Sequence, residues 1–518
     1  MTSRYATLLA FVCLCLHSVY SAKILGVFVV PSISHQVVFQ AIWKELSLRG
    51  HEVTVITPDP LNDKSLVNLT EIDVSSSYKT FREGNLQQSM SKALSVRDVV
   101  NNIFTLMATV LEEQFSHPEV QRLVRDKTKH FDLVIVEYFL PASFAFSELY
   151  NCPLIGVTSL SPPLNGLDVV GNPSHPVLNP DFFLPFADEL EFSDRITSFL
   201  HSIWFRYYHH YHLLPRQDEI AKKYIGKNLS YVGDIEKNVS MLFVNENLLI
   251  HPVRPSVPAL VQLGSMHIRK PKPLPKDLQK EFDAAKEGVV YFSLGSNVRS
   301  ASLSADVREK IIGALSEIPY KVLWKWEDES LPDQPKNVII RKWLPQQDVL
   351  GHPKVKVFVT QGGLQSIEES VTHGVPLVGI PFIADQPLNI KKMVDLGIAE
   401  SVDIETLTKE NLKAAILEVA GNPKYRNKVR EISQLIKDVP MTGVEKAVWW
   451  MEYVIRHKGA RHLRSPALDL PLYQYFLLDV ISFLLAVLII VIVIICTIVR
   501  LCIRIAKNHF KATKHKVS

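Results

Sequence analysis

The chain contains few cysteines, and their positions exclude a disulfide in its main part. Only five occur in 518 residues. Cys13 and Cys15 lie in an N-terminal apolar run, and Cys496 and Cys502 lie in or beside a C-terminal one. Cys152 is alone in the region between these runs, so no internal disulfide can form there. Cysteine content therefore gives no indication of the compartment.

Two other features are missing. The formal net charge is only +4 at pH 7, which provides no concentrated basic face, so we expect no nucleic-acid partner. The chain also has neither GxxxxGK[ST] nor GxGxxG, which excludes a P-loop and a dinucleotide-binding turn. A nucleotide site in this chain must be built differently.

The residues from Val357 to Glu400 form the most informative stretch. Val357–Val359 has the apolar, β-branched character of a buried parallel strand. A turn with Gln361, Gly362 and Gly363 follows, and a helical pattern begins at Leu364. Glycines let backbone N–H groups approach an anion, and a helix N-terminus adds partial positive charge. This pattern predicts a phosphate-binding site, and a plain structural turn is the alternative.

The next strand of this stretch ends in a polar pair. Leu377–Ile380 predicts a second buried strand, and the loop after it carries Asp385 and Gln386. Ligands of open α/β sheets bind at the carboxyl ends of the strands. The pair therefore stands where a ligand is expected.

These residues resemble the signature of the UDP-glycosyltransferase family, in which a HGG or QGG turn, a following Glu and an Asp-Gln pair hold a UDP-sugar. Trp343-Leu344-Pro345-Gln346 is similar to the family's W-x-P-Q element, and Gln361 is similar to the turn of insect-type membrane-bound UDP-glucosyltransferases. The resemblance runs from about Ile24 to the C-terminal tail. It implies an α/β fold of the GT-B type, with two Rossmann-like parallel-sheet domains facing a cleft and a C-terminal transmembrane helix.

The order of strands and helices agrees with two such domains. Ile24–Val30, His35–Leu48 and Glu52–Thr57 predict the strand, helix and strand of a parallel sheet. A Lys- and Pro-rich segment interrupts the pattern, which restarts at Val289–Leu294. The predicted parts are a signal peptide (1–21), an N-terminal acceptor-binding domain (22–265), a linker (266–280), a C-terminal UDP-sugar-binding domain (281–455), a juxtamembrane segment (456–479), a transmembrane helix (480–499) and a cytoplasmic basic tail (500–518).

The two ends of the chain predict a membrane address. Ala6–Leu16 is a short apolar run before small residues, as in a cleaved signal peptide, with an uncleaved anchor as the alternative. Val480–Val499 carries no charge and spans about 30 Å as a helix. The tail beyond it is basic. Positively charged segments beside a transmembrane helix stay in the cytoplasm, so we expect the rest of the protein on the other side of the membrane.

The tail also indicates which membrane this is. Lys514 and Lys516 resemble a KxKxx retrieval signal. We therefore expect a single-pass type I protein of the endoplasmic reticulum membrane with luminal catalytic domains. Sequons at Asn68, Asn228 and Asn238 predict N-glycosylation and agree with a lumen, although sequons also arise by chance.

A catalytic base is needed to remove the proton of an acceptor hydroxyl. Histidine suits this task because its unperturbed pKa lies near working pH. His35 follows the first predicted strand, and by resemblance it is the family's base; a structural histidine is the alternative. A carboxylate commonly orients such a base. The family has Asp after the strand that here reads Phe131–Val136, but Glu137 stands at that place.

The resemblance assigns the donor to the C-terminal domain. It implies that Trp343 stacks on uracil, that Gln346 reaches the base or ribose, and that Glu369 accepts hydrogen bonds from the ribose hydroxyls. The predicted UDP-sugar-binding residues are Gly295, Ser296, Trp343, Gln346, Gln361, Gly362, Gly363, Gln365, Glu369, Asp385 and Gln386. Among them, the glycine turns, Gln361 and Gln365 are expected to bind the diphosphate. The Asp-Gln pair is expected to bind sugar hydroxyls.

The resemblance implies inverting transfer of a hexose from a UDP-sugar to a hydroxyl of a small lipophilic acceptor. The product is a β-glycoside, formed in detoxification or metabolite conjugation, and the Asp385-Gln386 pair favours glucose, as in the insect branch of the family, over glucuronic acid. No cofactor is expected besides the UDP-sugar co-substrate. No metal is expected either, because the chain lacks Asp-x-Asp and its histidine-rich band, 198–213, holds no carboxylate or cysteine.

The alternative to an enzyme is a membrane-anchored protein that binds a nucleotide sugar or small ligand without turnover. The sequence does not identify the acceptor, and it leaves a homo-oligomer open.

Overall fold

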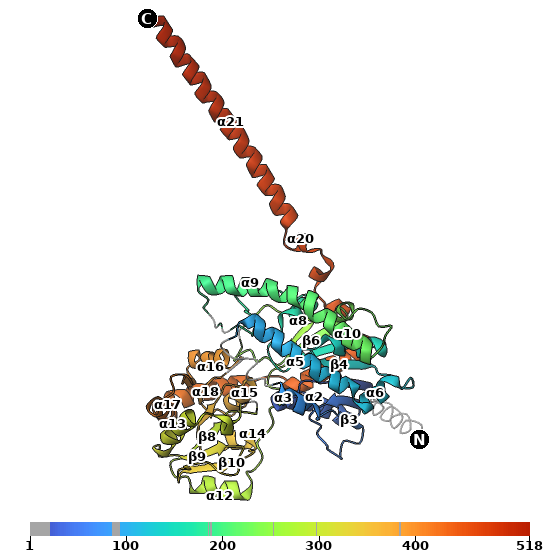
Figure 1. Ribbon diagram of the computed structural model, residues 1–518, viewed down its shortest axis with the longest axis vertical. Helices are drawn as coiled ribbons and strands as arrows, with labels where there is room; N and C mark the ends of the chain where they lie inside the picture. The colour runs from blue at the N-terminus through green and yellow to red at the C-terminus, as the bar shows by residue number, and fades with distance from the viewer. Residues whose placement is uncertain are drawn as a thin grey trace, which may run out of the picture. The chain divides into compact units, whose positions relative to one another are not determined.

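The computed structural model describes residues 21–84, 94–184, 186, 189–251, 253–296, 298–382 and 385–517, with side chains to residue 509. It divides into two units, one ending at Arg464 and one beginning at Ser465 (Figure 1). Residues 1–20, which hold nearly all of the predicted signal peptide, lie outside the described residues. The larger unit contains two parallel sheets, each covered by helices.

The first sheet has seven strands in the order β3-β2-β1-β4-β5-β6-β7, and all neighbouring pairs are parallel. The strands are β1 (Lys23–Val27), β2 (Glu52–Thr57), β3 (Leu69–Asp73), β4 (Leu133–Glu137), β5 (Leu154–Thr158), β6 (Val239–Val244) and β7 (Leu260–Gln262). Strands β4 and β5 are buried along their whole length, which explains their unbroken apolar sequences. The strand order reverses between β1 and β4, and a ligand crevice is expected at their carboxyl ends.

Two apolar layers hold this first domain together, one on each face of the sheet. The domain's helices are α2 (Ile33–Leu48), α3 (Ser77–Glu83), α5 (Val96–Ser116), α6 (Pro118–Arg125), α7 (Ala145–Leu149), α8 (Leu164–Val169), α9 (Phe192–Tyr208), α10 (Leu214–Tyr224) and α11 (Val232–Glu236), with a π-helical turn at His209–Leu213. One layer includes residues of α5 and α10, and the other includes residues of α2.

The second sheet has six parallel strands in the order β10-β9-β8-β11-β12-β13. The strands are β8 (Val289–Ser293), β9 (Lys321–Lys325), β10 (Val338–Arg341), β11 (Val355–Thr360), β12 (Leu377–Gly379) and β13 (Ala399–Ser401). The helices are α12 (Lys276–Ala284), α13 (Ala305–Ser316), α14 (Gln346–Leu350), α15 (Leu364–Thr372), α16 (Gln386–Asp395), α17 (Lys409–Gly421) and α18 (Pro423–Lys437). Because β8 and β11 are neighbours, with Ser293 paired to Thr360, the turns that follow them are adjacent.

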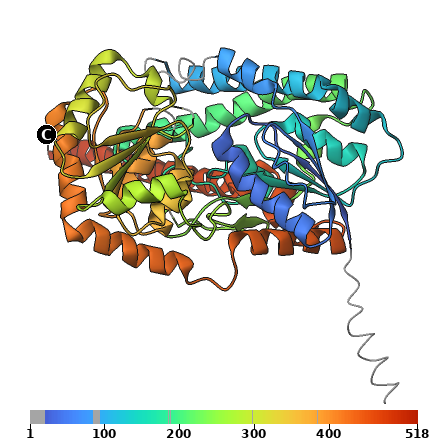
Figure 2. The same cartoon turned by 90° about the horizontal axis from the view of Figure 1, so that it is seen from below.

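Helix α19 (Gly443–Arg456) returns to the first domain, which differs from the predicted boundary at 455. Its Val448, Met451 and Val454 pack in one apolar cluster with Ile24 and Ile135 of the first sheet. Figure 2 shows this C-terminal helix beside the N-terminal helices. The apolar face of an amphipathic helix fits either sheet, so the sequence pattern alone cannot tell which one it covers.

Specific contacts hold the predicted linker in place. Arg269 donates to both carboxylate oxygens of Asp348, over 2.6 and 2.9 Å. The last five linker residues already belong to α12, which begins at Lys276. Ion pairing and helix formation both restrict this segment, so the relative position of the two sheets is held by specific contacts.

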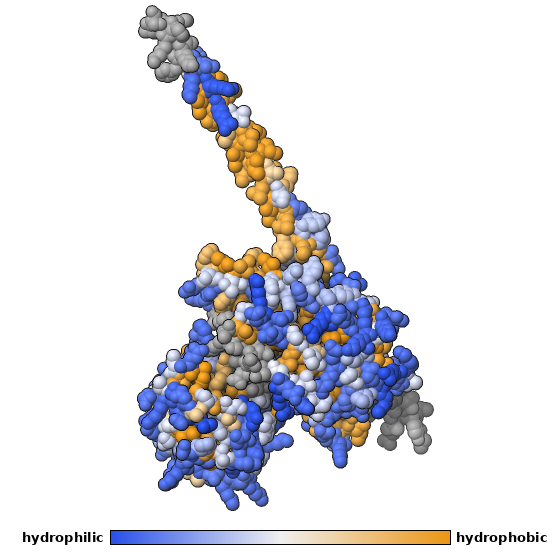
Figure 3. All heavy atoms as spheres, in the orientation of Figure 1, coloured by the Kyte–Doolittle hydropathy of each residue, from blue (hydrophilic) through white to orange (hydrophobic). Residues whose placement is uncertain are grey.

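The second unit contains α20 (Leu472–Tyr475) and the long helix α21 (Leu478–Val517). In the described part of the chain, α21 alone is long and apolar enough to cross a membrane, over Leu478–His509, and its most apolar 18-residue window has a mean hydropathy of 3.4. Its apolar side chains are exposed to solvent in this unit (Figure 3). The predicted transmembrane segment, 480–499, lies within it.

Candidate active site

A cavity of about 440 Å³ lies between the two domains. Residues that follow β1 and β5 line one side, and residues that follow β8 and β11 line the other. The predicted residues that line it are His35, Gly295, Ser296, Trp343, Gln346, Gln361, Gly363, Gln365, Glu369, Asp385 and Gln386. Glu137 and Gly362 do not line it: Glu137 is hydrogen-bonded to His35, and Gly362 lies between the lining residues Gln361 and Gly363 in the chain.

His35 and Glu137 form a hydrogen-bonded pair. His35 lies in the first turn of α2, two residues after the helix begins, and Glu137 ends β4. The distance from His35 Nδ1 to Glu137 Oε1 is 2.9 Å. A carboxylate can only accept, so Nδ1 carries the proton and Nε2 is the acceptor. His35 is therefore arranged to take a proton from a group in the cavity.

Glu137 is itself held in place. Its second oxygen accepts from the backbone N–H of Val30 at 2.9 Å, and the side chain is buried. The pairing of β1 with β4 matches Val27 to Val136, which brings Val30 and Glu137 to the same sheet edge. The longer glutamate side chain thus reaches the histidine while remaining anchored to the backbone.

Two glycine turns of the second domain face the cavity. Gly295 follows β8 with φ +78°, and Gly362 follows β11 with φ +91°, conformations that favour glycine. A Cβ on Gly295 would stand 2.3 Å from Gln361 Nε2, so the two turns pack closely. Helix α15 begins directly after Gly363, and its N-terminus adds partial positive charge next to these turns.

Trp343 and Lys325 form the outer part of this half. The Trp343 side chain is 61% exposed, which leaves ring surface available for stacking. Lys325 Nζ lies 5.6 Å from the ring centroid and donates to Glu327 Oε1 (2.9 Å) and Gly295 O (3.0 Å). Lys325, which the sequence did not single out, thus connects the Trp343 ring to the first glycine turn.

Gln346 and Glu369 act as one polar unit. Gln346 Nε2 donates to Glu369 Oε2 at 2.7 Å, and Gln347 Nε2 donates to Oε1 at 3.2 Å. Burial raises the pKa of Glu369 to about 7, against these hydrogen bonds. The carboxyl group is oriented toward the cavity wall by two amides.

Asp385 directly precedes α16, Gln386 is the first residue of that helix, and both line the cavity. Asp385 Oδ2 accepts from Asn389 Nδ2 at 2.6 Å, and the same amide donates to Gly362 O at 3.0 Å. Burial raises the pKa of Asp385, while the charge of His35 lowers it. That electrostatic interaction links His35 of the first domain to the predicted sugar site of the second.

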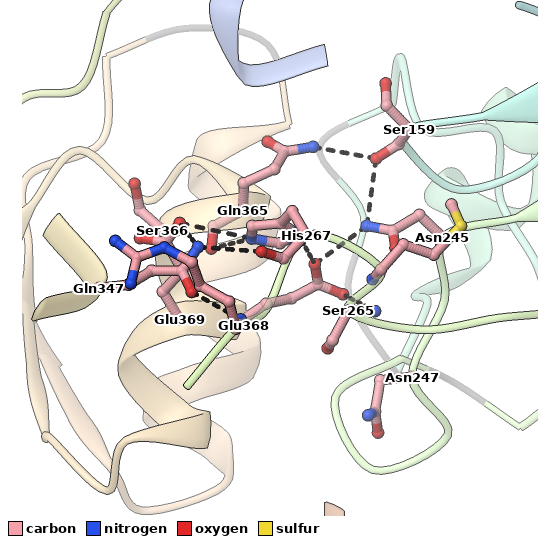
Figure 4. Close-up of polar contacts among 12 residues, drawn as sticks. Ser159, Asn245, Asn247, Ser265, His267, Gln347, Gln365, Ser366, Glu368 and Glu369 are labelled. Atoms are coloured by element: carbon pink, nitrogen blue, oxygen red, sulfur yellow. Dashed lines mark hydrogen bonds and ion pairs between the residues drawn. The ribbon is translucent and has the colours of Figure 1, made fainter. Parts of the chain in front are cut away.

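A buried polar network joins the two domains below the cavity (Figure 4). Glu368 accepts from Asn245 Nδ2 (2.9 Å), which follows β6, and from the backbone N–H of Ser265 (3.3 Å). Gln365 Nε2 donates to Ser159 O, which follows β5, at 3.0 Å. Helix α15 therefore contributes both to the cavity wall and to the attachment of the first domain.

His267 completes this network. Its Nε2–H donates to Gln365 O at 3.2 Å, and its Nδ1 lies 3.7 Å from Glu368 Oε2. Burial lowers the pKa of His267 to about 4 and raises that of Glu368 to about 8, so both groups are neutral near pH 7. No sequence pattern indicated a role for Glu368 or for His267, which lies in the predicted linker.

The half of the cavity on the first domain is apolar. Its apolar lining residues are Val30, Ile33, Val37, Phe81, Ile103, Leu106, Met107, Phe139, Leu160, Phe182 and Phe183. Such a surface favours a ligand that loses little hydration on binding. Helix α5 and the segment before α9 supply part of it, and residues 85–93 lie outside the described residues.

The structure argues against one predicted glycosylation site. Asn68 Nδ2 donates to Ser47 O (2.9 Å) and His51 O (2.6 Å), so a glycan would displace one of these bonds from a packed position. Asn228 and Asn238 are exposed. A sequon carries no information about whether its amide is already engaged, which is why the sequence did not separate the three.

The arrangement of the two domains is known from other proteins. The glycotransferase of kitacinnamycin matches with a TM-score of 0.53 and 19% identity, over 83% of this chain and 98% of that one. The TcCGT1 structure in complex with UDP matches with a TM-score of 0.55 and 14% identity, over 85% and 100%. The fold is therefore that of a GT-B glycosyltransferase.

The sequence relatives then define the family. The family model described as "UDP-glucoronosyl and UDP-glucosyl transferase" matches residues 23–514. UDP-glucosyltransferase 2 of Dactylopius coccus is 37% identical, over 90% of both chains. The ecdysteroid UDP-glucosyltransferase of Spodoptera littoralis nuclear polyhedrosis virus is 33% identical, over 89% of this chain and 93% of the relative. Human UDP-glucuronosyltransferase 2B15 is 33% identical, over 88% of both.

The chain belongs to the UDP-glycosyltransferase family, as its sequence motifs indicated. It is an enzyme that transfers a glycosyl group from a UDP-sugar to a small acceptor.

Proposed function

We propose that this enzyme transfers glucose from UDP-glucose to a hydroxyl group of a small lipophilic acceptor, with inversion at the anomeric carbon. The observation that carries the proposal is the His35–Glu137 pair, which faces the same cavity as the glycine turns and Asp385. A base on one domain and a donor site on the other are what a transfer between two bound molecules requires.

In this mechanism, His35 Nε2 accepts the proton of the acceptor hydroxyl as the oxygen forms its bond to the anomeric carbon. Glu137 stabilises the resulting imidazolium, because its charge lies 2.9 Å from the opposite ring nitrogen. The bond from the anomeric carbon to the diphosphate oxygen breaks in the same step, and UDP leaves with that electron pair. One displacement inverts the centre and gives a β-glycoside.

The departing diphosphate gains negative charge. Neutral hydrogen-bond donors of the second domain stabilise this charge. The N-terminus of α15, the backbone of Gly362 and Gly363, and the Gln361 amide supply hydrogen bonds and partial positive charge. These groups need no metal ion to act on the phosphate oxygens. Trp343 stacks on uracil, and Glu369 accepts hydrogen bonds from the ribose hydroxyls.

The charges around the cavity favour a neutral sugar. Among the described lining residues, the cations Arg269 and Lys325 are both engaged, with Asp348 and Glu327 respectively. Asp385, which is assigned to sugar hydroxyls, would repel a sugar carboxylate. These features support glucose over glucuronic acid, and two of the relatives are named as UDP-glucosyltransferases.

Donor choice tests the proposal directly. With a lipophilic phenol as acceptor, we expect kcat/KM for UDP-glucose to exceed that for UDP-glucuronate at least tenfold, measured by release of UDP. Faster turnover with UDP-glucuronate would contradict the donor assignment. If UDP-glucose binds but no UDP is released when any of a panel of phenols and alcohols is added, the result would instead favour a binding protein without turnover.

The membrane address belongs to the same proposal. Helix α21 spans the membrane of the endoplasmic reticulum, the catalytic domains are luminal, and the basic residues beyond it stay in the cytoplasm. The acceptors are apolar compounds that partition into that membrane, which fits a role in detoxification or metabolite conjugation. The apolar lining of the acceptor half supports this class of substrate.

A further inference from the structure

Helix α2 carries a glutamine at the first position of its buried face. This face continues with Phe39, Trp43 and Leu46, which pack in one apolar cluster with the first sheet. Gln36 is 0% exposed, and it directly follows His35 in the chain. Burial of an amide is costly unless its hydrogen bonds are made inside the protein. The partners of Gln36 therefore indicate why a polar side chain stands at this position.

Both ends of the Gln36 amide are hydrogen-bonded. Its Nε2 donates to Val30 O at 2.9 Å. Its Oε1 accepts from the hydroxyl of Thr57, the last residue of β2, also at 2.9 Å. Thr57 is as fully buried as Gln36. Because an amide donates from one end and accepts at the other, the Thr57 hydroxyl keeps Nε2 directed at Val30.

Val30 is held through both of its backbone polar groups. Its N–H donates to Glu137 Oε2 at 2.9 Å. Its carbonyl oxygen accepts from the Ser32 N–H at 2.8 Å as well as from Gln36. The bond from Ser32 already satisfies this buried carbonyl, so the Gln36 amide is not needed merely to supply it with a partner. The additional bond instead connects α2 to the residue whose N–H holds Glu137.

These bonds form a ring that begins and ends on adjacent residues of α2. It runs from Gln36 to Val30, then from Val30 to Glu137. A bond of 2.9 Å from Glu137 Oε1 to His35 Nδ1 closes it. We propose that Gln36 and Thr57 are positioning residues for the transfer reaction, which hold Val30 so that Glu137 keeps His35 in one orientation. The inference rests on the proposed role of His35 as the base. A glutamate has one more rotatable bond than an aspartate, so its carboxylate depends more on such a fixed second contact.

Two substitutions of Thr57 separate positioning from packing. Thr57→Val keeps the shape of the side chain and removes the hydroxyl, whereas Thr57→Ser keeps the hydroxyl and removes a methyl group. With the full-length enzyme in detergent, UDP-glucose and a simple alcohol, we expect kcat of Thr57→Val to fall at least tenfold. This is part of the roughly 10²- to 10⁴-fold that a general base contributes. Thr57→Ser should stay within about twofold of the wild type. KM for UDP-glucose should be unchanged in both, because the proposed donor site lies on the second domain.

Gln36→Leu removes the amide and leaves the Thr57 hydroxyl, with its bond from the Asp59 N–H, in place. It should lower kcat for the alcohol at least tenfold, and less for an acidic nitrophenol, which needs less help in losing its proton. Gln121→Leu is the matched control, because Gln121 Nε2 also donates to backbone carbonyls, those of residues 115 and 224, and does not line the cavity. In a Glu137→Ala background, Gln36→Leu should cause no further loss, since it acts through Glu137.

A lower kcat for Thr57→Ser than for Thr57→Val would show that packing matters more than the hydroxyl and would overturn the proposal. A further tenfold loss from Gln36→Leu in the Glu137→Ala background would also overturn it. His35→Ala, measured alongside, separates this inference from the proposed mechanism. If His35→Ala is slow while Gln36→Leu and Thr57→Val keep the wild-type kcat, only the positioning role fails. If His35→Ala transfers at the wild-type rate, the mechanism and the positioning role fail together.

Discussion

At the scale of single residues, a glutamate is hydrogen-bonded to the proposed catalytic base, at the place where the resemblance led us to expect an aspartate. Glu137 reaches His35 Nδ1 at 2.9 Å because its other oxygen is fixed by the Val30 N–H. The sequence predicted the pair from resemblance. It could not show that the extra methylene would be accommodated, since that depends on the backbone of a different strand.

The neutral pair of Glu368 and His267 gives the stability of the enzyme a pH dependence. Burial raises the pKa of Glu368 to about 8 in the folded state, above the ordinary value of 4.5. Between those values the folded chain retains a proton that the unfolded chain releases, so this contribution to stability falls as pH rises. It is fully present below about pH 4.5 and is lost as pH passes 8.

Glu368→Gln should remove this contribution. The melting temperature of the wild type minus that of the variant should decrease between pH 5.5 and pH 8, by on the order of 5 °C, as followed by thermal unfolding in detergent. His267 and Glu369 titrate in both proteins and cancel in the difference. Glu431→Gln, at an exposed position on α18, is the control. A difference that does not change with pH would show that Glu368 is ionised in the folded enzyme.

At the scale of elements, the donor site depends on two neighbouring strand–turn units. The pairing of Ser293 with Thr360 aligns the ends of β8 and β11, which brings Gly295 against Gln361. Sequence patterns predicted each turn separately. They could not predict the contact between the turns, because the register of non-consecutive strands is set by the packing of the whole sheet.

Gly295→Ala tests this contact. A Cβ there would displace the Gln361 amide, so KM for the UDP-sugar should rise at least several-fold, and the positive φ should destabilise the fold by about 1–2 kcal/mol. Gly397→Ala is the matched control, because Gly397 has φ +72° but nothing within 4 Å of its Cβ position. Initial-rate kinetics and thermal unfolding of both variants separate the effects. An equal KM in the two variants would contradict the role of the turn contact.

Helices show the same limit of sequence reasoning. The side chain of Thr408 accepts from the Asn411 N–H at the start of α17, and threonine is a residue type that favours this capping position. Capping and amphipathic patterns are local, so they identify such elements well. The assignment of α19 to the first domain is a tertiary choice, and the apolar periodicity of the helix is compatible with either sheet.

At the scale of the whole molecule, the orientation of the domains across the membrane decides which sequons meet the glycosylation machinery. We expect Asn228 and Asn238 to carry glycans and Asn68 to carry none, because its amide is engaged in the fold. Asn228→Gln and Asn238→Gln should each increase gel mobility after expression in insect cells, and Asn68→Gln should not. Absence of any glycan together with digestion of the domains by protease in sealed microsomes would contradict the luminal orientation.

In the proposed mechanism, one domain binds the nucleotide and the other transfers the proton. The nucleotide is assigned to the second domain, whereas the proposed base, His35, lies on α2 of the first, so its loss should leave UDP binding intact. General-base catalysis contributes roughly 10²- to 10⁴-fold to rate. The sequence could predict this division from its motifs, but the distance between base and donor site depends on contacts such as Gln365 with Ser159, which no motif encodes.

The most direct measurement is the transfer rate of His35→Ala with a simple alcohol, alongside its affinity for UDP. We predict a rate reduced roughly 10²- to 10⁴-fold with unchanged UDP affinity, a smaller reduction with acidic nitrophenols, and no further loss when Glu137→Gln is added to His35→Ala. Transfer to the alcohol at the wild-type rate by His35→Ala would contradict the mechanism.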